Sequence, residues 1–365
     1  MKRLKLFAFG SALALALAFT GCKTEVSNTG SADTPSTPTF TGTAYTALPA
    51  GTNGTAGTSG TYVHFGDWPQ TIKADSVTVD ESQSVTMGAN TYYKGSDGAW
   101  YAKCTEKANG SGYKYSDGTD VAQASANSTK YFKVEPIKWR VLTDNYSGKK
   151  LLLAESILIN CAYYDYYNVN RSIGGNTVYP NNYKESRVRA YLNGLSYTKK
   201  ESDSAEQVTD SSFLGKGFFQ TAFTSTAQSQ IADTTVDNSA DSTTDSESNI
   251  TKATSYACEN TSDKIFLLSE QEVTNSDYGF AAYNVYKGDS NGTTESTRIR
   301  MTTDWSRAGG AYQNTNAGYG GWWWLRSPGC SNSGFARDVG NRGSAEGYDY
   351  VGRDYAVVVP ALSIN

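Results

Sequence analysis

The chain has 365 residues and a formal net charge of −4, so it lacks the basic field that would attract nucleic acid. A single histidine, His64, excludes multi-histidine metal sites and most nucleophilic triads. We therefore expect no nucleic-acid partner, no metal, no cofactor and no catalytic residue.

The first 21 residues predict a lipoprotein signal peptide. The basic start Met1–Lys5 precedes an apolar run, Leu6–Phe19, that is too short to span a membrane and typical of a signal core. Thr20 and Gly21 stand directly before Cys22 and resemble a bacterial lipobox, so Cys22 is the predicted lipidation site. An ordinary secretory signal is the alternative. Lipidation would anchor the chain to the bacterial cell envelope, at the outer membrane and exposed at the surface.

Residues 22–60 predict a flexible tether. They are rich in Ser, Thr, Gly, Pro and Ala, and they contain too little apolar surface to offset the entropy lost on folding. A chain of this composition serves as a linker. The folded domain is therefore expected over residues 61–365.

Strand patterns dominate the first part of this domain. Thr61–Ile72 reads as a strand that ends at a proline turn, and Asn90–Tyr101 reads as a hairpin. Apolar residues alternate with charged ones in Ile137–Leu142, which predicts a half-buried strand, and Lys150–Asn160 predicts a buried one. The best helix spans Ser186–Leu195, with Ser186 as its N-cap.

The second part of the domain is less regular. Phe213–Ala232 predicts a second helical patch, and a polar stretch near residues 224–262 predicts a solvated surface insertion. Asp263–Ser269 predicts another buried strand. Strands and helices do not alternate regularly, so the fold class is α+β, with antiparallel sheets, few helices and long irregular loops.

Four cysteines besides Cys22 leave their redox state open. Cys104, Cys161, Cys258 and Cys330 are widely spaced, and they allow three disulfide pairings or free buried thiols. No two cysteines have the close spacing of a zinc site.

The C-terminal segment, near residues 319–362, predicts a rigid frame around an exposed surface. Two apolar runs flank a middle made mostly of Gly, Ser, Asn, Asp, Arg and Tyr. The frame is predicted to bury Trp323, Leu325, Val357, Val359 and Leu362, with Arg326 as a structural hydrogen-bond donor. Tyr, Ser, Gly and Asn with some Arg form the residue set of antibody paratopes.

The polar and aromatic residues of this middle are the candidate ligand site, because exposed Tyr and Arg are enriched at binding hot spots. An ordinary solvated loop is the alternative. The candidate residues are Ser331, Asn332, Ser333, Phe335, Arg337, Asp338, Asn341, Arg342, Ser344, Glu346, Tyr348, Asp349, Tyr350, Arg353, Asp354 and Tyr355.

Seven short motifs occur in a fixed order along the domain. They are Phe65–Gln70, Ile137–Leu142, Leu151–Ala154, Ser186–Asn193, Asp263–Ser269, Trp323–Gly329 and Val359–Leu362. In this order they resemble the bacterial DUF6273 family, which implies a C-type lectin-like fold of the formylglycine-generating-enzyme subtype. Within that group the chain resembles treponemal variable (TvpA-like) lipoproteins. That resemblance implies that a diversity-generating retroelement rewrites the ligand-facing positions of the C-terminal segment.

The function implied is binding of a host or microbial surface protein or glycan by a lipid-anchored variable protein. A structural envelope lipoprotein is one alternative. An oxidoreductase-like enzyme is another, because the resemblance includes enzymes with a reactive cysteine pair, for which Cys258 and Cys330 are the available candidates. Calcium binding stays open, although Glu135 and Pro136 are followed by Ile137 in place of the asparagine of a calcium-and-sugar motif.

Overall fold

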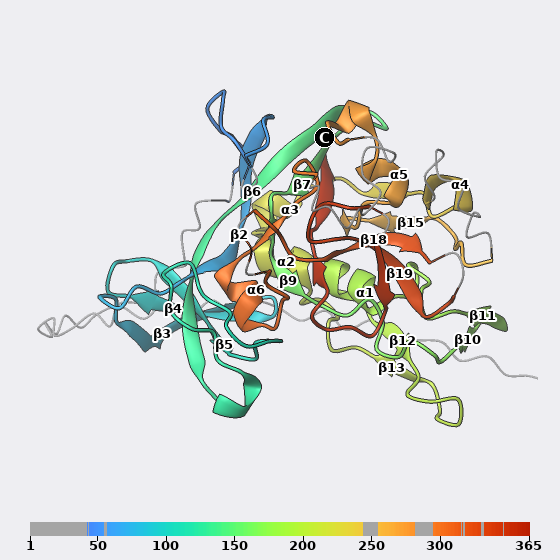
Figure 1. Cartoon of the computed structure of the whole chain (residues 1–365), viewed down its shortest axis with the longest axis horizontal. Coiled ribbons are helices and arrows are strands. Elements are labelled where there is room, and N and C mark those ends of the chain that lie inside the picture. Colours follow the sequence, from blue (N-terminus) through green and yellow to red (C-terminus); the bar gives the residue numbers. More distant parts are fainter. Residues whose placement is uncertain are drawn as a thin grey trace, which may run out of the picture. The chain divides into compact units, whose positions relative to one another are not determined.

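The longest strand, β6 (Thr129–Tyr146), forms the centre of a nine-stranded sheet (Figure 1). Ile137 and Trp139 are almost fully buried, as their alternation predicts. The strand has 18 residues, enough to pair antiparallel with three neighbours along its length. These are β5 (Trp100–Thr105) at its start, β2 (Tyr62–Ile72) along its middle and β7 (Lys149–Ala154) at its end.

The computed structural model describes residue 42 and residues 44–54, 57–243, 255–281, 295–314, 316, 318–329, 332–345 and 347–365. The predicted signal peptide and the lipidation site Cys22 lie outside these residues. Further strands of the large sheet are β1 (Thr46–Ala47), which pairs with β2, and β3 (Val79–Met87), β4 (Asn90–Gly95), β16 (Ile265–Phe266) and β22 (Ala361–Ile364).

Part of the range assigned to the tether lies on the domain. Thr46 and Ala47 of β1 pair with His64 and Val63 of β2. These contacts attach the described end of residues 22–60 to the large sheet.

The strand predicted to end at a proline turn continues through Pro69. Pro69 pairs with Val134, and the register shifts by one residue between Pro69 and Thr71. The extra residue of this β-bulge is Gln70, and beyond it β2 continues to Ile72. The prediction of a turn here was wrong, because proline ends a strand only where its missing donor would break the ladder.

A second, five-stranded sheet carries the C-terminal segment. Its central strand, β18 (Trp323–Pro328), is buried at every position. Trp323 and Leu325 are fully buried, as are Val357, Val359 and Leu362, which confirms the predicted frame. The sheet order is β20 (Gly347–Tyr350), β19 (Phe335–Val339), β18, β21 (Val357–Val358) and β9 (Ile159–Asn160).

The helices are short. The predicted helix forms as α1 (Arg187–Asn193), and the Ser186 hydroxyl accepts a hydrogen bond from the Arg189 N–H at 3.1 Å. The other α-helices are α2 (Phe218–Ala222), α3 (Ser225–Gln228), α4 (Ala240–Thr243), α5 (Glu270–Val273) and α6 (Asp304–Ala308). In the described part of the chain, 3₁₀ turns also span Ala124–Ala126 and Ser276–Tyr278.

Among the described residues, four further pairs of short strands form, three of them antiparallel. The pair β8 (Ser156–Ile157) and β17 (Met301–Thr302) is parallel. The antiparallel pairs are β10 (Arg171–Ile173) with β11 (Asn176–Val178), β12 (Tyr197–Lys199) with β13 (Val208–Asp210), and β14 (Thr234–Val236) with β15 (Thr261–Asp263), while β21 pairs with β9 inside the second sheet.

The polar stretch near residues 224–262 is more than a solvated loop where it is described. Ala227, Ile231 and Val236 are buried in the core, and Asn238 is buried as well. Its amide donates to the Glu259 carbonyl at 3.0 Å. Small polar residues in this stretch therefore pack and hydrogen-bond within the domain.

The architecture is a sheet-rich α+β fold, with mostly antiparallel strands and few helices, as predicted. Of the helices in the described part of the chain, none has both the length and the hydropathy needed to cross a membrane.

The buried carboxylate of Asp304 links helix α6 to strand β2 and to the turn at Ser116. Asp304, at the start of α6, accepts hydrogen bonds from the Ile72 N–H at 3.0 Å and the Ser116 N–H at 2.8 Å. The Ser116 hydroxyl and the Arg307 guanidinium, at 3.1 Å, donate to the same carboxylate. A buried charge with this many donors is stable only while all of them are in place.

We expect Asp304→Ala to lower the free energy of unfolding by about 3 kcal/mol, because it leaves two backbone donors without an acceptor and removes the carboxylate paired with Arg307. Chemical denaturation of the purified protein measures this change. As a control, Asp144→Ala removes an exposed carboxylate whose partner is Lys150, and we expect a change below about 0.5 kcal/mol. Equal effects of the two substitutions would contradict the role given to Asp304.

Candidate ligand-binding surface

The C-terminal sheet rests on a buried arginine. Arg326 of β18 donates to the Leu267 carbonyl at 2.9 Å and forms an ion pair with Glu272 of α5. The Tyr146 hydroxyl donates to the same glutamate at 2.7 Å. Arg326 is 2% exposed, so it cannot touch a ligand, and its predicted role as a structural donor is confirmed.

Two of the candidate site residues belong to this buried layer. Arg337 of β19 lies 3.3 Å from the Glu270 carboxylate, and its side chain is 5% exposed. Asp338 is also buried, against Gly347 of the neighbouring strand. Neither side chain faces solvent, so the exposed surface does not include them.

The register of β19 and β20 brings three aromatic candidates together. Phe335 pairs with Tyr350, and Arg337 pairs with Tyr348, which places these side chains on one face of the two strands. The Phe335 ring lies 5.1 Å from that of Tyr348 and 4.4 Å from that of Tyr350, measured between centroids. Tyr348 is 58% exposed and Tyr350 is 37% exposed.

A residue that the sequence reasoning missed completes this group. Tyr167 lies in the loop after β9, is 48% exposed, and has its ring 4.7 Å from that of Tyr350. We call Tyr167, Phe335, Tyr348 and Tyr350 the tyrosine face. The run from Tyr163 to Asn168, with four tyrosines, has the same composition as the C-terminal segment and was the available signal.

The turn after β20 adds a charged residue beside the tyrosine face. Arg353 is 43% exposed, and its guanidinium lies 3.2 Å from the Asp349 carboxylate. It also lies over the rings of Tyr350, at 5.6 Å, and Tyr355, at 5.1 Å. Tyr355 continues toward Trp322, whose ring centroid is 6.0 Å away. The structure therefore brings Asp349, Arg353 and Tyr355 next to Tyr350.

The remaining candidates lie around this centre. Asn332 and Asp354 are exposed, and Ser333, Asn341, Arg342 and Ser344 are partly buried. The Ser333 carbonyl accepts from the Asn181 N–H at 3.0 Å, and Arg342 lies 4.8 Å from the Tyr319 ring. Ser331 and Glu346 lie outside the described residues, as does Cys330.

A cavity opens beside the tyrosine face. It has a volume of about 480 Å³ and lies between the loop after β9 and the turn after β20. We call it the Tyr167 cleft, and its lining residues are Asp165, Tyr166, Tyr167, Asn168, Tyr350, Gly352 and Arg353. This volume falls within the range of about 300–1,000 Å³ that small-molecule sites occupy.

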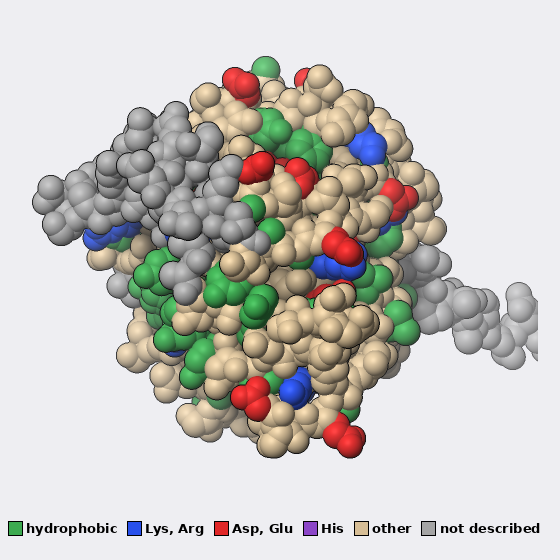
Figure 2. Space-filling view, turned by 90° about the vertical axis from the view of Figure 1, so that its right-hand side faces the viewer, with side chains coloured by type: hydrophobic (Ala, Val, Ile, Leu, Met, Phe, Trp, Pro, Cys, Tyr) green, Lys and Arg blue, Asp and Glu red, His purple; other side chains and the backbone are tan. Residues whose placement is uncertain are grey.

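Charges are mixed over the part of the surface seen in Figure 2. Acidic and basic side chains are scattered among polar ones, and hydrophobic side chains lie in groups between them. The surface seen in Figure 2 therefore carries no extended region of one charge sign. Among the described residues, no three His, Cys, Asp or Glu side chains are grouped to hold a metal ion.

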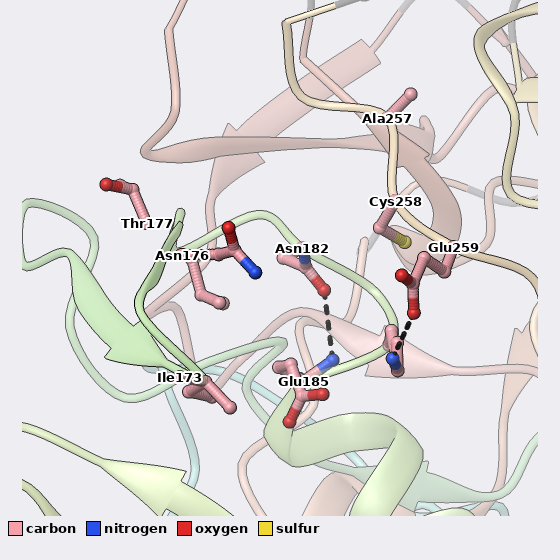
Figure 3. Close-up of a pocket in the computed structure, with 10 residues that line it drawn as sticks. Ile173, Asn176, Thr177, Asn182, Glu185, Ala257, Cys258 and Glu259 are labelled. Atoms are coloured by element: carbon pink, nitrogen blue, oxygen red, sulfur yellow. Dashed lines mark hydrogen bonds and ion pairs between the residues drawn. The ribbon is translucent and has the colours of Figure 1, made fainter.

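A second cavity, also about 480 Å³, lies beside the β10–β11 hairpin (Figure 3). Polar groups on its wall are paired with one another. The Lys184 ammonium lies 2.5 Å from the Glu259 carboxylate, and the Asn182 side-chain oxygen accepts a hydrogen bond from the Glu185 N–H at 3.0 Å. Burial raises the pKa of the Cys258 thiol on its wall. A thiol with a raised pKa is a poor nucleophile.

The other described cysteines are similar. Cys104, Cys161 and Cys258 all have free thiols. Burial raises the pKa of Cys104 and that of Cys161 to about 11. No activated thiol is present in the part of the chain that the structure describes.

Asp338 makes the stability of the C-terminal sheet depend on pH. Its burial, and secondarily the nearby Asp349 carboxylate, raise the pKa of Asp338 from 3.8 to about 7. The folded state then holds a proton that the unfolded state has released between pH 4 and 7. Stability contributed by this group is therefore full below pH 4 and is lost as the pH rises through 7.

We expect Asp338→Asn to remove this loss, because the amide stays neutral at every pH. The free energy of unfolding, measured by urea denaturation from pH 4 to 8, should fall less with rising pH in the variant than in the wild type. The two falls should differ by up to about 4 kcal/mol. Asp349→Asn is the control: it removes the neighbouring charge and should shift the decline to lower pH. Parallel pH profiles of the wild type and Asp338→Asn would contradict the assignment.

Comparison with known proteins places this surface in a family. Residues 147–365, more than half of the chain, match the family described as a domain of unknown function, DUF6273. The match begins just before β7, so it includes the whole five-stranded sheet and excludes the strands β1–β6. No curated protein and no solved structure matches the chain. The chain belongs to the DUF6273 family.

Proposed function

We propose that this protein binds a macromolecular ligand, a host or microbial surface protein or glycan, through the exposed side of its C-terminal sheet. The observation that carries the proposal is the tyrosine face. Tyr348 and Tyr350 are exposed beside a third exposed tyrosine, Tyr167, so three large rings gather on one part of the surface. Exposed aromatic groups with polar neighbours are characteristic of interaction sites.

The contacts that fix the rings of the tyrosine face also favour a binding role. The Phe335 ring contacts those of Tyr348 and Tyr350, and the Tyr167 ring contacts that of Tyr350. The Arg337–Glu270 ion pair holds β19, which carries Phe335. A rigid support limits the entropy lost when a ligand binds. Tyrosine itself loses little entropy, because it has few rotatable bonds.

Three finer parts of the proposal rest on the resemblance stated in the sequence analysis. They are a C-type lectin-like subtype of the fold, diversification of the exposed positions by a retroelement, and attachment to the outer membrane through lipid on Cys22. Display at the cell surface would place the tyrosine face where a macromolecular ligand can reach it.

The triple substitution Tyr348→Ala, Tyr350→Ala and Arg353→Ala tests the proposal. We expect it to abolish binding in a screen of extracellular proteins and glycans, because it removes two aromatic contacts and one cationic contact. The melting temperature should change little, since the three side chains are exposed or partly exposed.

The control is Tyr93→Ala, which removes a partly buried tyrosine of β4 in the other sheet and should leave binding intact. Retained binding in the triple variant would refute the proposed surface. A large fall in its melting temperature would show that these side chains stabilise the fold.

A further inference from the structure

The Tyr167 cleft allows the class of ligand to be specified, on the assumption that the proposed function is correct. One wall comes from the C-terminal segment, through Tyr350, Gly352 and Arg353. The other wall comes from Tyr167 and its neighbours, which lie more than 180 residues earlier in the sequence. A ligand in this cleft would therefore touch a part of the chain that lies outside the predicted variable segment.

The charged groups that line the cleft are already paired. Arg353 forms an ion pair with Asp349 at 3.2 Å. Asp165 accepts from the Arg187 guanidinium at 2.7 Å and from the Tyr197 hydroxyl at 2.7 Å. An ionic ligand would have to compete with these contacts, and Asp165, whose side chain is only 12% exposed, would lose its partners at a cost. The cleft therefore favours a neutral ligand.

What the cleft offers a neutral ligand is aromatic surface with hydrogen-bonding groups at its edge. Tyr166, Tyr167 and Tyr350 supply rings and hydroxyls, and the exposed Asn168 supplies an amide that can donate and accept. A sugar ring has an apolar C–H face and hydroxyls at its rim, which match such a lining. The volume of about 480 Å³ also suits a small ring-shaped group.

An extended peptide is less well matched. A peptide strand would have to pair with the free edge of β20, next to the cleft. At Tyr350 this edge is already used, because its N–H donates to the Asp349 side chain at 2.7 Å and its carbonyl accepts from the Arg353 N–H at 2.9 Å. The backbone beside the cleft therefore has no pair of groups to offer a new strand at this position.

We propose that the Tyr167 cleft binds one sugar ring of a neutral glycan, with the ring against Tyr167 and Tyr350 and its hydroxyls toward Asn168 and Arg353. Tyr167 and Asn168 then form a constant wall of the site. The C-terminal segment supplies the wall that differs if these positions are diversified.

The test is a glycan array probed with the purified full chain, with neutral, sialylated and sulfated glycans side by side. Calorimetric titration with the neutral oligosaccharide that binds best follows. We expect neutral glycans to bind, and Tyr167→Ala to weaken that binding about tenfold through loss of the aromatic contact. Asn168→Ala should weaken it by a smaller factor. Tyr256→Ala, a partly exposed tyrosine packed on Tyr179 beside the other cavity, is the matched control and should bind as the wild type does.

Several results would overturn the inference: binding of charged glycans only, neutral binding that survives Tyr167→Ala, or neutral binding weakened equally by the Tyr256→Ala control. Because Tyr167 is exposed, its variant should keep the wild-type melting temperature, and this measurement separates lost contact from lost folding. If a protein ligand binds through Tyr348 and Tyr350 while every glycan fails, the cleft inference falls and the proposed function stands. If neither proteins nor glycans bind, both fall.

Discussion

The C-terminal sheet depends on the pairing of two buried arginines with two glutamates of one short helix. Arg326 of β18 pairs with Glu272, and Arg337 of β19 pairs with Glu270, both from α5. Buried charges without partners would cost several kcal/mol each, so strand and helix positions are linked. The Tyr146 hydroxyl extends this link to β6 of the large sheet. The helix is itself fixed by Ser269, which accepts from the Glu272 N–H while Glu272 accepts from the Ser269 N–H.

This arrangement separates stability from recognition within the same two strands. Arg337 is buried and paired with Glu270, whereas the rings of Tyr348 and Tyr350 each contact Phe335 and are exposed to solvent. Changes on the exposed side therefore remove few core contacts. A surface that tolerates substitution while its support stays rigid suits the ligand-binding role proposed for it.

Much of the fold was predictable because periodicity and capping are local. The alternation around Trp139 identified β6, and Ser186 identified the start of α1. Composition was a weaker guide. It treated every polar residue between the two apolar runs as exposed, although Arg337 and Asp338 are buried. The burial of Arg337 depends on α5, which lies more than 60 residues earlier in the sequence and supplies the carboxylate that Arg337 needs. No local pattern encodes that partner.

The sequence by itself determined the strands β6 and β7, the helix α1, the buried frame around Trp323 and Leu325, and the choice of Tyr348, Tyr350 and Arg353 as exposed residues, because these depend on the residues' own hydropathy and spacing. Only the tertiary structure decided which of the polar candidates reach solvent, and that Tyr167 lies against Tyr350. It also placed the cleft, since a cleft has two walls and here they come from segments far apart in the chain. Contacts between distant segments depend on the packing of both sheets, and the spacing of residues along one segment does not encode them.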